Sequence, residues 1–253
     1  MEALKIDVIQ KKRELVLFIR ETVRASGLKR AVLGLSGGVD SSLVAALAKE
    51  ALGAKNVLGI YLPYGSHRSD ANDVDALVKK LGIRRKTINI APMVNAYFKP
   101  STRANKVRRG NFMARQRMAV LYDQSKDFGA LVFGTGNRTE CLLGYFTLYG
   151  DSGCALNPVA GLYKTQVWQM ARALGIPDPI VNKKPSAGLW PDQTDEGELG
   201  FTYREVDRLL YAMIDKKIPP ARLQRKGFSK TFIAKVRQHI AETEFKRRPS
   251  VTP

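Results

Sequence analysis

The apolar residues in the first third of the chain follow two different patterns. Over residues 4–25 they recur at helical spacing, which predicts an amphipathic helix. Residues 31–35 and 56–62 are instead short and almost wholly apolar, and 86–90 continues the series with a third short segment. Such runs are typical of parallel strands that are buried on both faces. The pattern therefore changes from helix to buried strand after residue 25.

Helices are predicted between these strands, at about 40–52 and 70–81. Gly53 and Gly82 follow them in the C-cap position that glycine favours, and Asp70 is a good N-cap for the second. An alternation of strand and helix implies a parallel sheet with right-handed crossovers. The fold class is accordingly α/β, with a doubly wound, mainly parallel sheet and helices on both faces.

The rest of the chain extends this alternation and then becomes mainly helical. Further elements are expected as a helix over 101–126, a strand over 129–133, and helices over about 165–174, 203–216 and 229–244. Residues 181–202 are polar and interrupted by Pro and Gly, which predicts a long loop of the kind that often serves as a lid. We interpret residues 1–253 as a single domain, with a core at about 12–180 and a C-terminal loop and helices at about 181–248.

Charge and composition narrow the partners that the chain can have. Lys and Arg number 42 against 23 Asp and Glu, so the net charge is +19 and anionic partners are expected. Two cysteines and two histidines are too few for a disulfide scaffold or a histidine-rich metal cluster, and they suit a reducing cytoplasm. Cys141 and Cys154 are interpreted as small buried apolar residues. No stretch predicts a membrane span, and the N-terminus lacks the apolar core of a signal peptide.

A glycine-rich segment, Gly34-Leu-Ser-Gly-Gly-Val-Asp-Ser-Ser42, joins the first strand to its helix. Paired glycines let the backbone approach a ligand closely, and free amides at the helix start favour an anion such as phosphate. Asp40 would repel that phosphate unless a divalent cation lay between them, and hard oxygen ligands favour Mg2+. The alternative is a simple tight turn with Asp40 as the helix N-cap. The GxxxxGK[ST] and GxGxxG patterns do not fit this segment.

The segment Ser36-Gly-Gly-Val-Asp-Ser41 closely resembles the PP-loop of the N-type ATP pyrophosphatases. Later segments resemble, in order and spacing, motifs of the NAD synthetases; they are residues 134–140, 143–151, 158–164, and 183–189 with 193–196. The chain is thus identified as a member of the ammonia-dependent NAD synthetase family. This implies a Rossmann-like fold of the adenine nucleotide α-hydrolase type. Glutamine-dependent relatives carry an added amidase domain, and we expect none here because the glycine loop begins at residue 34.

The resemblance implies a ligase reaction and roles for individual residues. ATP adenylates the nicotinate carboxylate of deamido-NAD+, pyrophosphate leaves, and ammonia displaces AMP to give NAD+. The expected ATP contacts are Gly34, Leu35, Ser36, Gly37, Gly38, Val39, Asp40, Ser41, Thr135, Lys164 and Ser186. Asp40 and Glu140 match Mg2+ ligands, and Arg115 and Lys246 match contacts to deamido-NAD+. Asp151 would orient or deprotonate ammonia and Lys164 would offset phosphate charge, so these two are the expected catalytic residues. A cytoplasmic homodimer is also implied.

Some of these residues have a plainer interpretation when the resemblance is set aside. Thr135 would then be a helix N-cap and Lys164 a solvated surface lysine. Asp151 would be a turn residue, and Arg115 would join a solvated basic face. His67 is either part of a mobile flap over ATP or a surface histidine.

The chain also departs from the family pattern at two positions. Leu148 and Ala155 stand where many relatives have Lys and Asp in the pocket for the dinucleotide. We therefore expect deamido-NAD+ to be held differently here, or by neighbouring cations such as Arg138 or Lys246.

The main alternative function is a PP-loop enzyme that adenylates tRNA, which the net charge of +19 favours. Such an enzyme gives no reason for the NAD synthetase segments, and the chain has neither a CxxC pair nor an evident RNA-binding domain. A non-catalytic nucleic-acid-binding protein is a third reading, but it would have no use for Asp40 and Glu140 among bound anions. We therefore expect small-molecule partners, and neither nucleic acid nor a membrane.

Overall fold

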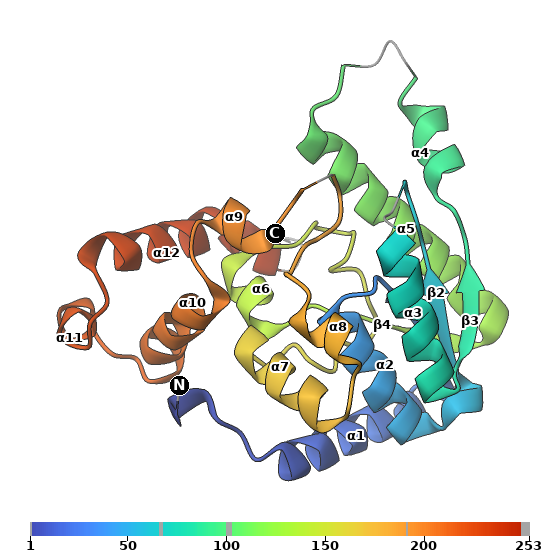
Figure 1. The fold of residues 1–253 in the computed structure, drawn as a ribbon, viewed down its shortest axis with the longest axis horizontal. Coiled ribbons are helices and arrows are strands. Elements are labelled where there is room, and N and C mark those ends of the chain that lie inside the picture. The colour runs from blue at the N-terminus through green and yellow to red at the C-terminus, as the bar shows by residue number, and fades with distance from the viewer. Residues whose placement is uncertain (1, 66–67, 100–102, 191, 249–253) are drawn as a thin grey trace, which may run out of the picture.

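The computed structural model describes residues 2–65, 68–99, 103–190 and 192–248, which include a parallel four-stranded sheet (Figure 1). The strands lie in the order β3-β2-β1-β4, so the first strand along the chain is an inner one. Their bounds are β1 (Arg30–Leu35), β2 (Val57–Tyr61), β3 (Arg84–Thr87) and β4 (Ala130–Phe133). In β1, Leu33 pairs with Gly59 of β2 on one side and with Phe133 of β4 on the other. The predicted α/β class with a parallel sheet is confirmed.

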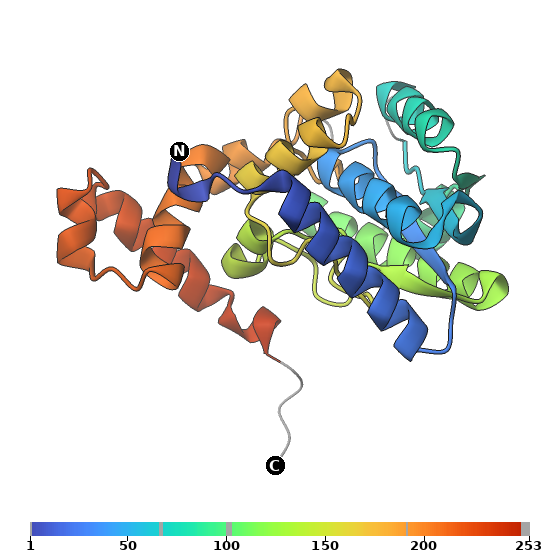
Figure 2. The same ribbon diagram turned by 90° about the horizontal axis from the view of Figure 1, so that it is seen from below.

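Helices cover both faces of the sheet (Figure 2). One face packs against α1 (Val8–Ala25), α2 (Val39–Leu52), α3 (Arg68–Leu81), α7 (Lys164–Ala173) and α8 (Asp178–Asn182), and the other against α4 (Ala91–Tyr97) and α5 (Lys106–Phe128). Neighbouring strand residues point to opposite faces, so Leu33 is buried in the first core and Val32 in the second. The chain changes face between β3 and β4, which confirms double winding and places a switch point between β1 and β4. Open α/β sheets bind ligands at such points, outside the carboxyl ends of the strands.

A third apolar core lies beside the sheet and is built mainly by the C-terminal helices, at the left of Figure 1. The helices of this region are α6 (Arg138–Leu143), α9 (Asp195–Leu199), α10 (Tyr203–Leu210), α11 (Pro220–Arg225) and α12 (Lys230–Glu242). A π-helical turn, Tyr211–Asp215, extends α10, and short 3-10 helices lie at Glu2–Leu4, Ala54–Asn56 and Glu244–Arg247. Leu143 of α6 and Tyr163, just before α7, belong to this core. The C-terminal helices are therefore packed directly on the loops that follow β4.

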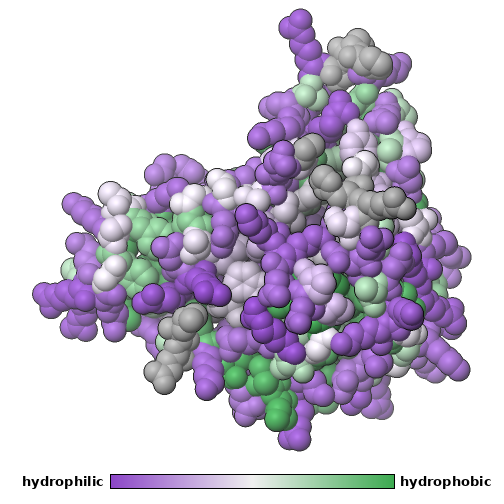
Figure 3. Space-filling model, in the orientation of Figure 1, coloured by the Kyte–Doolittle hydropathy of each residue, from purple (hydrophilic) through white to green (hydrophobic). Residues whose placement is uncertain are grey.

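The surface on the face drawn in Figure 3 is mainly hydrophilic, with apolar patches over the C-terminal helices and along the lower edge. Exposed apolar side chains on α1 include Ile9, Leu17 and Phe18. Of the helices in the described ranges, none combines the length and the apolar character that a membrane crossing needs.

The structure corrects several predicted boundaries. α1 begins at Val8 rather than at residue 4, because the Asp7 carboxylate caps it by accepting the amides of Ile9 and Gln10 at 3.0 Å. Asp70 lies in the first turn of α3 and is not its N-cap.

Short helices account for most of the remaining differences. α4, α6 and α11 have no counterpart in the prediction, and the predicted loop over 181–202 contains the end of α8 and the whole of α9. Helices this short are marginal by themselves and are stabilised by tertiary packing, which a local pattern does not reveal.

Candidate active site

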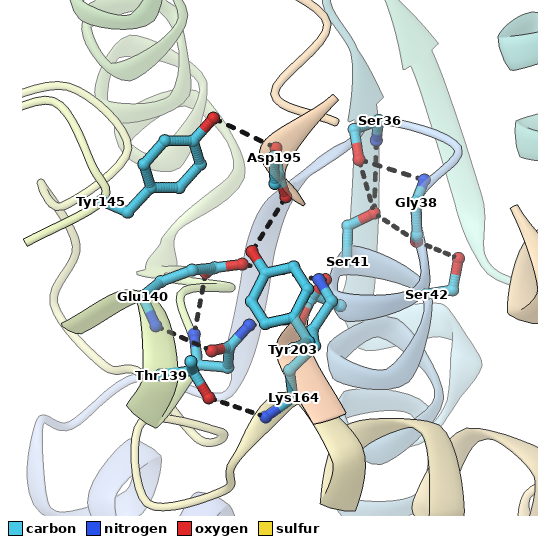
Figure 4. A network of polar contacts seen from close by, with 12 residues as sticks. Ser36, Gly38, Ser41, Ser42, Thr139, Glu140, Tyr145, Lys164, Asp195 and Tyr203 are labelled. Atoms are coloured by element: carbon cyan, nitrogen blue, oxygen red, sulfur yellow. Dashed lines mark hydrogen bonds and ion pairs between the residues drawn. The ribbon is translucent and has the colours of Figure 1, made fainter. Parts of the chain in front are cut away.

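The glycine-rich segment forms a turn at the carboxyl end of the inner strand β1. The strand ends at Leu35 and α2 begins at Val39, with Gly38 in the N-cap position. Two hydroxyl groups stabilise the turn, because Ser41 and Ser42 donate hydrogen bonds to the Gly38 carbonyl at 3.1 and 2.8 Å (Figure 4). Glycine has no side chain with which to cap the helix amides. The start of α2 is therefore suited to an anion, which the partial positive charge of a helix N-terminus attracts.

Gly37 is needed as glycine in this turn. Its φ of 76° lies in the left-handed region, and a Cβ at this position would lie 3.1 Å from the carbonyl oxygen of Asp70. Lys183, after α8, holds the same end of α3, since its ammonium contacts Asp70 Oδ1 at 2.7 Å and Asp73 Oδ2 at 2.5 Å. The turn is thus packed tightly against α3, to which the segment after α8 is also tied.

Two carboxylates converge on one ammonium group beside this turn. Asp40 lies in the first turn of α2 and Glu140 in the first turn of α6, and these helices follow the neighbouring strands β1 and β4. Lys164, the first residue of α7, places Nζ against Asp40 Oδ2 and 3.5 Å from Glu140 Oε1. Lys164 is 2% exposed. The three side chains form an ion-pair cluster at the switch point of the sheet, in which Lys164 is buried and the two carboxylates are partly buried.

The environment of the cluster shifts the pKa of two of its members. Burial and, after it, the charge of Asp40 raise the pKa of Glu140 from an ordinary 4.5 to about 8. Burial by itself lowers the pKa of Lys164, but attraction to Asp40 and Glu140 outweighs that effect and the net shift is upward. Lys164 is therefore a fixed positive charge at neutral pH. Ionisation of Glu140, by contrast, depends on having a cation beside it.

The C-terminal helices complete the surroundings of Lys164. The ring of Tyr203, the first residue of α10, has its centre 5.1 Å from the Lys164 ammonium, within the range of a cation–π contact. The Tyr203 hydroxyl donates to Asp195 at 2.9 Å, and the Tyr145 hydroxyl donates to Asp195 at 3.3 Å (Figure 4). Tyr145 also donates to Glu198 at 2.6 Å. Hydrogen bonds therefore join acidic and aromatic side chains that are far apart in the sequence, next to the Lys164 ammonium.

A buried carboxylate from α10 fixes the backbone of Lys164. Asp207 is fully buried and accepts hydrogen bonds from Thr139 Oγ1 at 2.6 Å and from the amide of Thr165 at 2.8 Å. Thr139 Oγ1 in turn accepts from the amide of Lys164 at 3.0 Å. Asp207 therefore joins the first turns of α6 and α7, so the position of Lys164 depends on α10.

Comparison with known proteins identifies the family. A family model described as NAD synthase matches residues 11–250. The chain belongs to the NAD synthase family. Two curated relatives, from Trichlorobacter lovleyi and Fusobacterium nucleatum, are named NH(3)-dependent NAD(+) synthetase and are 50% and 45% identical to it over 249 residues. Each alignment covers 98% of this chain, together with 91% of the first relative and 96% of the second.

Two solved structures share the fold over nearly the full chain. An NH3-dependent NAD synthetase from Campylobacter jejuni, in complex with the nitrate ion, has a TM-score of 0.84 at 33% identity, covering 98% of this chain and 100% of its own. An NMN synthetase from Francisella tularensis has a TM-score of 0.87 at 31% identity, covering 98% of this chain and 99% of its own. The predicted family and its fold are confirmed.

The candidate metal ligands in this NAD synthase chain are two carboxylates. Within the described ranges, no group of three or more His, Cys, Asp or Glu side chains is arranged to hold a metal ion. Mg2+ commonly takes one or two carboxylates and completes its coordination with waters and substrate phosphates. The Lys164 ammonium stands at the point shared by Asp40 and Glu140, where a cation is evidently accommodated. The donor set therefore fits a divalent cation that arrives with a nucleotide.

Three other predicted residues meet at one turn. Asp151 Oδ1 accepts from the amide of Thr147 at 2.8 Å, and desolvation raises the pKa of Asp151 above its usual range. Arg115 Nε donates to a backbone carbonyl of the segment 144–151 at 3.2 Å, and Lys246 Nζ donates to two carbonyls of this segment at 2.8 Å. The predicted base and the two predicted substrate cations thus lie around the same few residues.

The remaining predicted contacts lie outside the ion-pair cluster. Thr135 is half-buried, two residues after the end of β4. Ser186 is exposed between α8 and α9, and its hydroxyl accepts a local hydrogen bond from Gly188 at 3.1 Å. Arg138 forms an ion pair with Asp215, so it is engaged within the protein.

The structure bears on the interpretation of the two cysteines, and it does not support that interpretation for both. Cys141 is exposed, so its interpretation as a buried apolar residue is wrong, whereas Cys154 is partly buried. The Cys154 sulfur lies 2.5 Å from where a Cβ on Gly134 would be, which explains a glycine at the end of β4. His67 lies outside the described residues.

Several residues of the site have no role in the sequence analysis, among them Asn137, Asp195, Tyr203 and Asp207. Asn137 and Asp195 lie inside segments that carry the family resemblance. The sequence therefore indicates that these segments matter, but it does not reveal which residues Asn137 and Asp195 contact. Asp207 has a local signal, because it shares a buried helical face with Tyr203 and Leu210, and a carboxylate in such a stripe demands a partner.

Proposed function

We propose that this chain is an ammonia-dependent NAD+ synthetase. It uses ATP to adenylate the nicotinate carboxylate of deamido-NAD+ and then joins ammonia to the activated carbonyl, giving NAD+, AMP and pyrophosphate. Family membership and 45–50% identity to curated NH(3)-dependent NAD(+) synthetases support this reaction. The structural observation that carries the proposal is the cluster of Asp40, Glu140 and Lys164 beside a glycine turn.

ATP binds along the turn formed by residues 34–41, with Thr135, Lys164 and Ser186 as further contacts. The amides at the start of α2 donate hydrogen bonds to the phosphate oxygens, because glycine at position 38 has no side chain to cap them. Asp40 and Glu140 hold Mg2+, which when bound offsets the negative charge of the triphosphate. The switch point between β1 and β4 supports this placement, since both carboxylates come from helices that begin there.

Adenylation requires positive charge close to the reacting phosphate. A carboxylate oxygen of deamido-NAD+ attacks the α-phosphorus, and the bond to the pyrophosphate oxygen breaks. Lys164 is buried and stays protonated at neutral pH, so its ammonium stabilises the charge that develops on the phosphate oxygens. To reach them it exchanges its contacts with Asp40 and Glu140 for contacts with phosphate.

Amidation requires ammonia with a free lone pair. The nitrogen attacks the carbonyl carbon of the acyl adenylate, and AMP leaves with the oxygen that joined it to the carbonyl. Ammonium has no lone pair, so a base must first remove a proton. Asp151 takes this role, because its raised pKa makes its carboxylate a better proton acceptor than an ordinary aspartate. Arg115 and Lys246, which donate to backbone carbonyls of the segment that contains Asp151, hold deamido-NAD+.

The proposal extends to the organisation of the enzyme. Residues 1–253 act as one catalytic domain, with the core at about 12–180 and the C-terminal part at about 181–248. The protein works as a homodimer in the cytoplasm. Packing of α6 and Tyr163 with the C-terminal helices supports treating both parts as one unit.

A substrate panel tests the function. The protein is incubated with ATP, Mg2+ and ammonium, and pyrophosphate release is measured with deamido-NAD+, with nicotinate mononucleotide, or with total tRNA. We expect release only with deamido-NAD+, and more with ammonium than with glutamine. Release with the mononucleotide instead would assign the activity of the Francisella tularensis NMN synthetase, and release with tRNA would assign a tRNA-modifying enzyme.

A further inference from the structure

Asn137 holds one oxygen of each carboxylate in the Asp40–Glu140–Lys164 cluster. Its side-chain Nδ2 donates to Asp40 Oδ1 at 2.9 Å, and its backbone amide donates to Glu140 Oε2 at 3.1 Å. The opposite oxygens, Asp40 Oδ2 and Glu140 Oε1, are those that contact the Lys164 ammonium. Each carboxylate is therefore held by Asn137 on one side and faces a cation on the other.

Both ends of the Asn137 side chain are used. Oδ1 accepts from the amide of Glu140 at 3.0 Å, which makes Asn137 the N-cap of α6. With Oδ1 fixed as the acceptor, the amide nitrogen is left as the donor toward Asp40. Asn137 is fully buried, so the side chain has no room to exchange these partners for water. Serine and threonine also cap helices well, but they have no second polar arm.

The contact with Asp40 is not explained by helix capping. Asn137 and Glu140 follow β4, whereas Asp40 lies 97 residues earlier, in the helix that follows β1. A cap needs only Oδ1, so the donation from Nδ2 across the switch point is an additional, independent feature. Its effect is to fix the orientation of a carboxylate on one loop relative to a carboxylate on the next.

We propose that Asn137 is a positioning residue for the divalent cation that accompanies ATP. By holding Asp40 Oδ1 and Glu140 Oε2, it directs the two remaining oxygens to the common position where the Lys164 ammonium lies. The inference rests on the proposed function, since it places metal-bound ATP in this cluster. Asn137 acts through the two carboxylates and is not itself a metal ligand.

Loss of the Nδ2 donor has a specific consequence. Asp40 is then free to rotate and to offer both oxygens to Lys164, so the ion pair competes better against an incoming cation. The coupling between Mg2+ and nucleotide binding, which is the ratio of the nucleotide dissociation constants without and with Mg2+, is therefore the quantity that falls.

Variants that keep the cap separate positioning from capping. Asn137→Ser and Asn137→Thr retain an acceptor for the first turn of α6, but neither hydroxyl reaches Asp40. The matched control is Asn105→Ser. Asn105 is also a helix N-cap, for α5, and accepts from the amide of Arg108 at 2.8 Å, but it is exposed. The control makes the same chemical change at a cap whose side chain contacts no carboxylate among the residues that the structure describes.

Calorimetry with α,β-methylene ATP, which blocks cleavage at the α-phosphate, measures the dissociation constant with and without Mg2+. Mg2+ should tighten binding to the wild type and to Asn105→Ser alike. In both Asn137 variants this tightening should fall roughly 10- to 100-fold, the loss usual when a residue supporting metal ligands is removed. Undiminished tightening in a folded Asn137 variant would overturn the inference and leave Asn137 as a helix cap.

Two further measurements on the wild-type protein test the inference independently of the variants. In wild-type protein, the Asn137 side-chain NH2 protons should stay protected from exchange when Mg2+ and the analogue bind; their exposure would overturn the inference even if neither variant folds. Wild-type pyrophosphate release with deamido-NAD+ and ammonium is measured alongside. If it is present while tightening is unaffected, the inference fails and the proposed function stands; if it is absent, both fail.

Discussion

Lys164 and Asp40 form an ion pair across 124 residues of chain, next to a turn suited to phosphate. The pair matters because Lys164 is 2% exposed, and an unpaired ammonium at that depth would be costly. A ligand that enters must therefore bring a cation for Asp40 and an anion for Lys164. Metal-bound ATP carries both charges, which explains how a closed ion-pair cluster also serves as a nucleotide site.

Asp40→Asn should reduce pyrophosphate release by about 100-fold or more, since removing charge stabilisation from a reacting site typically costs this much. The amide has the same shape as the carboxylate but removes the charge that pairs with the buried Lys164 ammonium, so the variant should also unfold at a lower temperature, and rates are compared at a temperature where both proteins are folded. Steady-state rates over a range of Mg2+ concentrations provide the measurement, with the exposed Asp123→Asn on α5 as the control. Full activity of Asp40→Asn at ordinary Mg2+ would remove Asp40 from the metal site.

Glu140 should give the ligand-free protein a pH-dependent stability. Its pKa is about 8 in the folded protein, against an ordinary 4.5 that applies when the chain is unfolded. The folded state therefore binds this proton more tightly, so the stabilisation is complete below about pH 4.5 and is lost as the pH rises through 8. Glu140→Gln, which cannot ionise, should lack this decline. Urea unfolding of both proteins from pH 5 to 8.5, without Mg2+ or nucleotide, measures the difference, and parallel curves would refute the assignment.

Gly37→Ala should weaken ATP binding, because its Cβ would press on the Asp70 carbonyl and displace the turn. Gly27→Ala is the matched control: its φ of 75° is nearly the same as the 76° of Gly37, but a Cβ there meets nothing within 4 Å. Both variants should lose about 1–2 kcal/mol of unfolding free energy to left-handed strain. Only Gly37→Ala should raise the KM for ATP, and an equal rise in both variants would show that the turn does not contact the nucleotide.

Asp207→Ala should destabilise the fold by about 2–6 kcal/mol, because two buried donors lose their acceptor and each costs about 1–3 kcal/mol. Those donors are Thr139 Oγ1 and the amide of Thr165. Glu244→Ala removes an exposed ion pair with Arg248 instead and should cost less than about 1 kcal/mol. Chemical unfolding of the two variants makes the comparison. Similar losses for both would mean that Asp207 does not hold α7 in place.

The fold was predictable where strands are buried and less so where they are not. β1 and β2 have nearly continuous apolar sequences because helices cover both of their faces. β3 lies at the edge of the sheet with every residue exposed, so it has no apolar pattern, and the predicted 86–90 overlaps the observed Arg84–Thr87 only in part. A strand that is buried on both faces has a nearly continuous apolar sequence, and this is why it can be recognised from the sequence.

The residues of the candidate site also differ in how well the sequence predicts them. Asp40, Glu140 and Lys164 stand in segments with a recognisable pattern, and the structure brings these three together. Tyr203 and Asp207 stand in an ordinary amphipathic helix, and their relation to Lys164 exists only after α10 has packed beside α7. Contacts between side chains far apart in sequence depend on that packing, which no local spacing encodes.

The most direct test follows the two oxygen atoms of the nicotinate carboxylate into the products. Deamido-NAD+ labelled with 18O in both oxygens of its nicotinate carboxylate is converted with ATP, Mg2+ and ammonium, and the products are analysed by mass spectrometry. Attack at the α-phosphorus predicts one 18O in AMP, one retained in the amide of NAD+ and none in pyrophosphate. Unlabelled AMP, or 18O in a phosphate product other than AMP, would contradict adenylation in the Asp40–Glu140–Lys164 site.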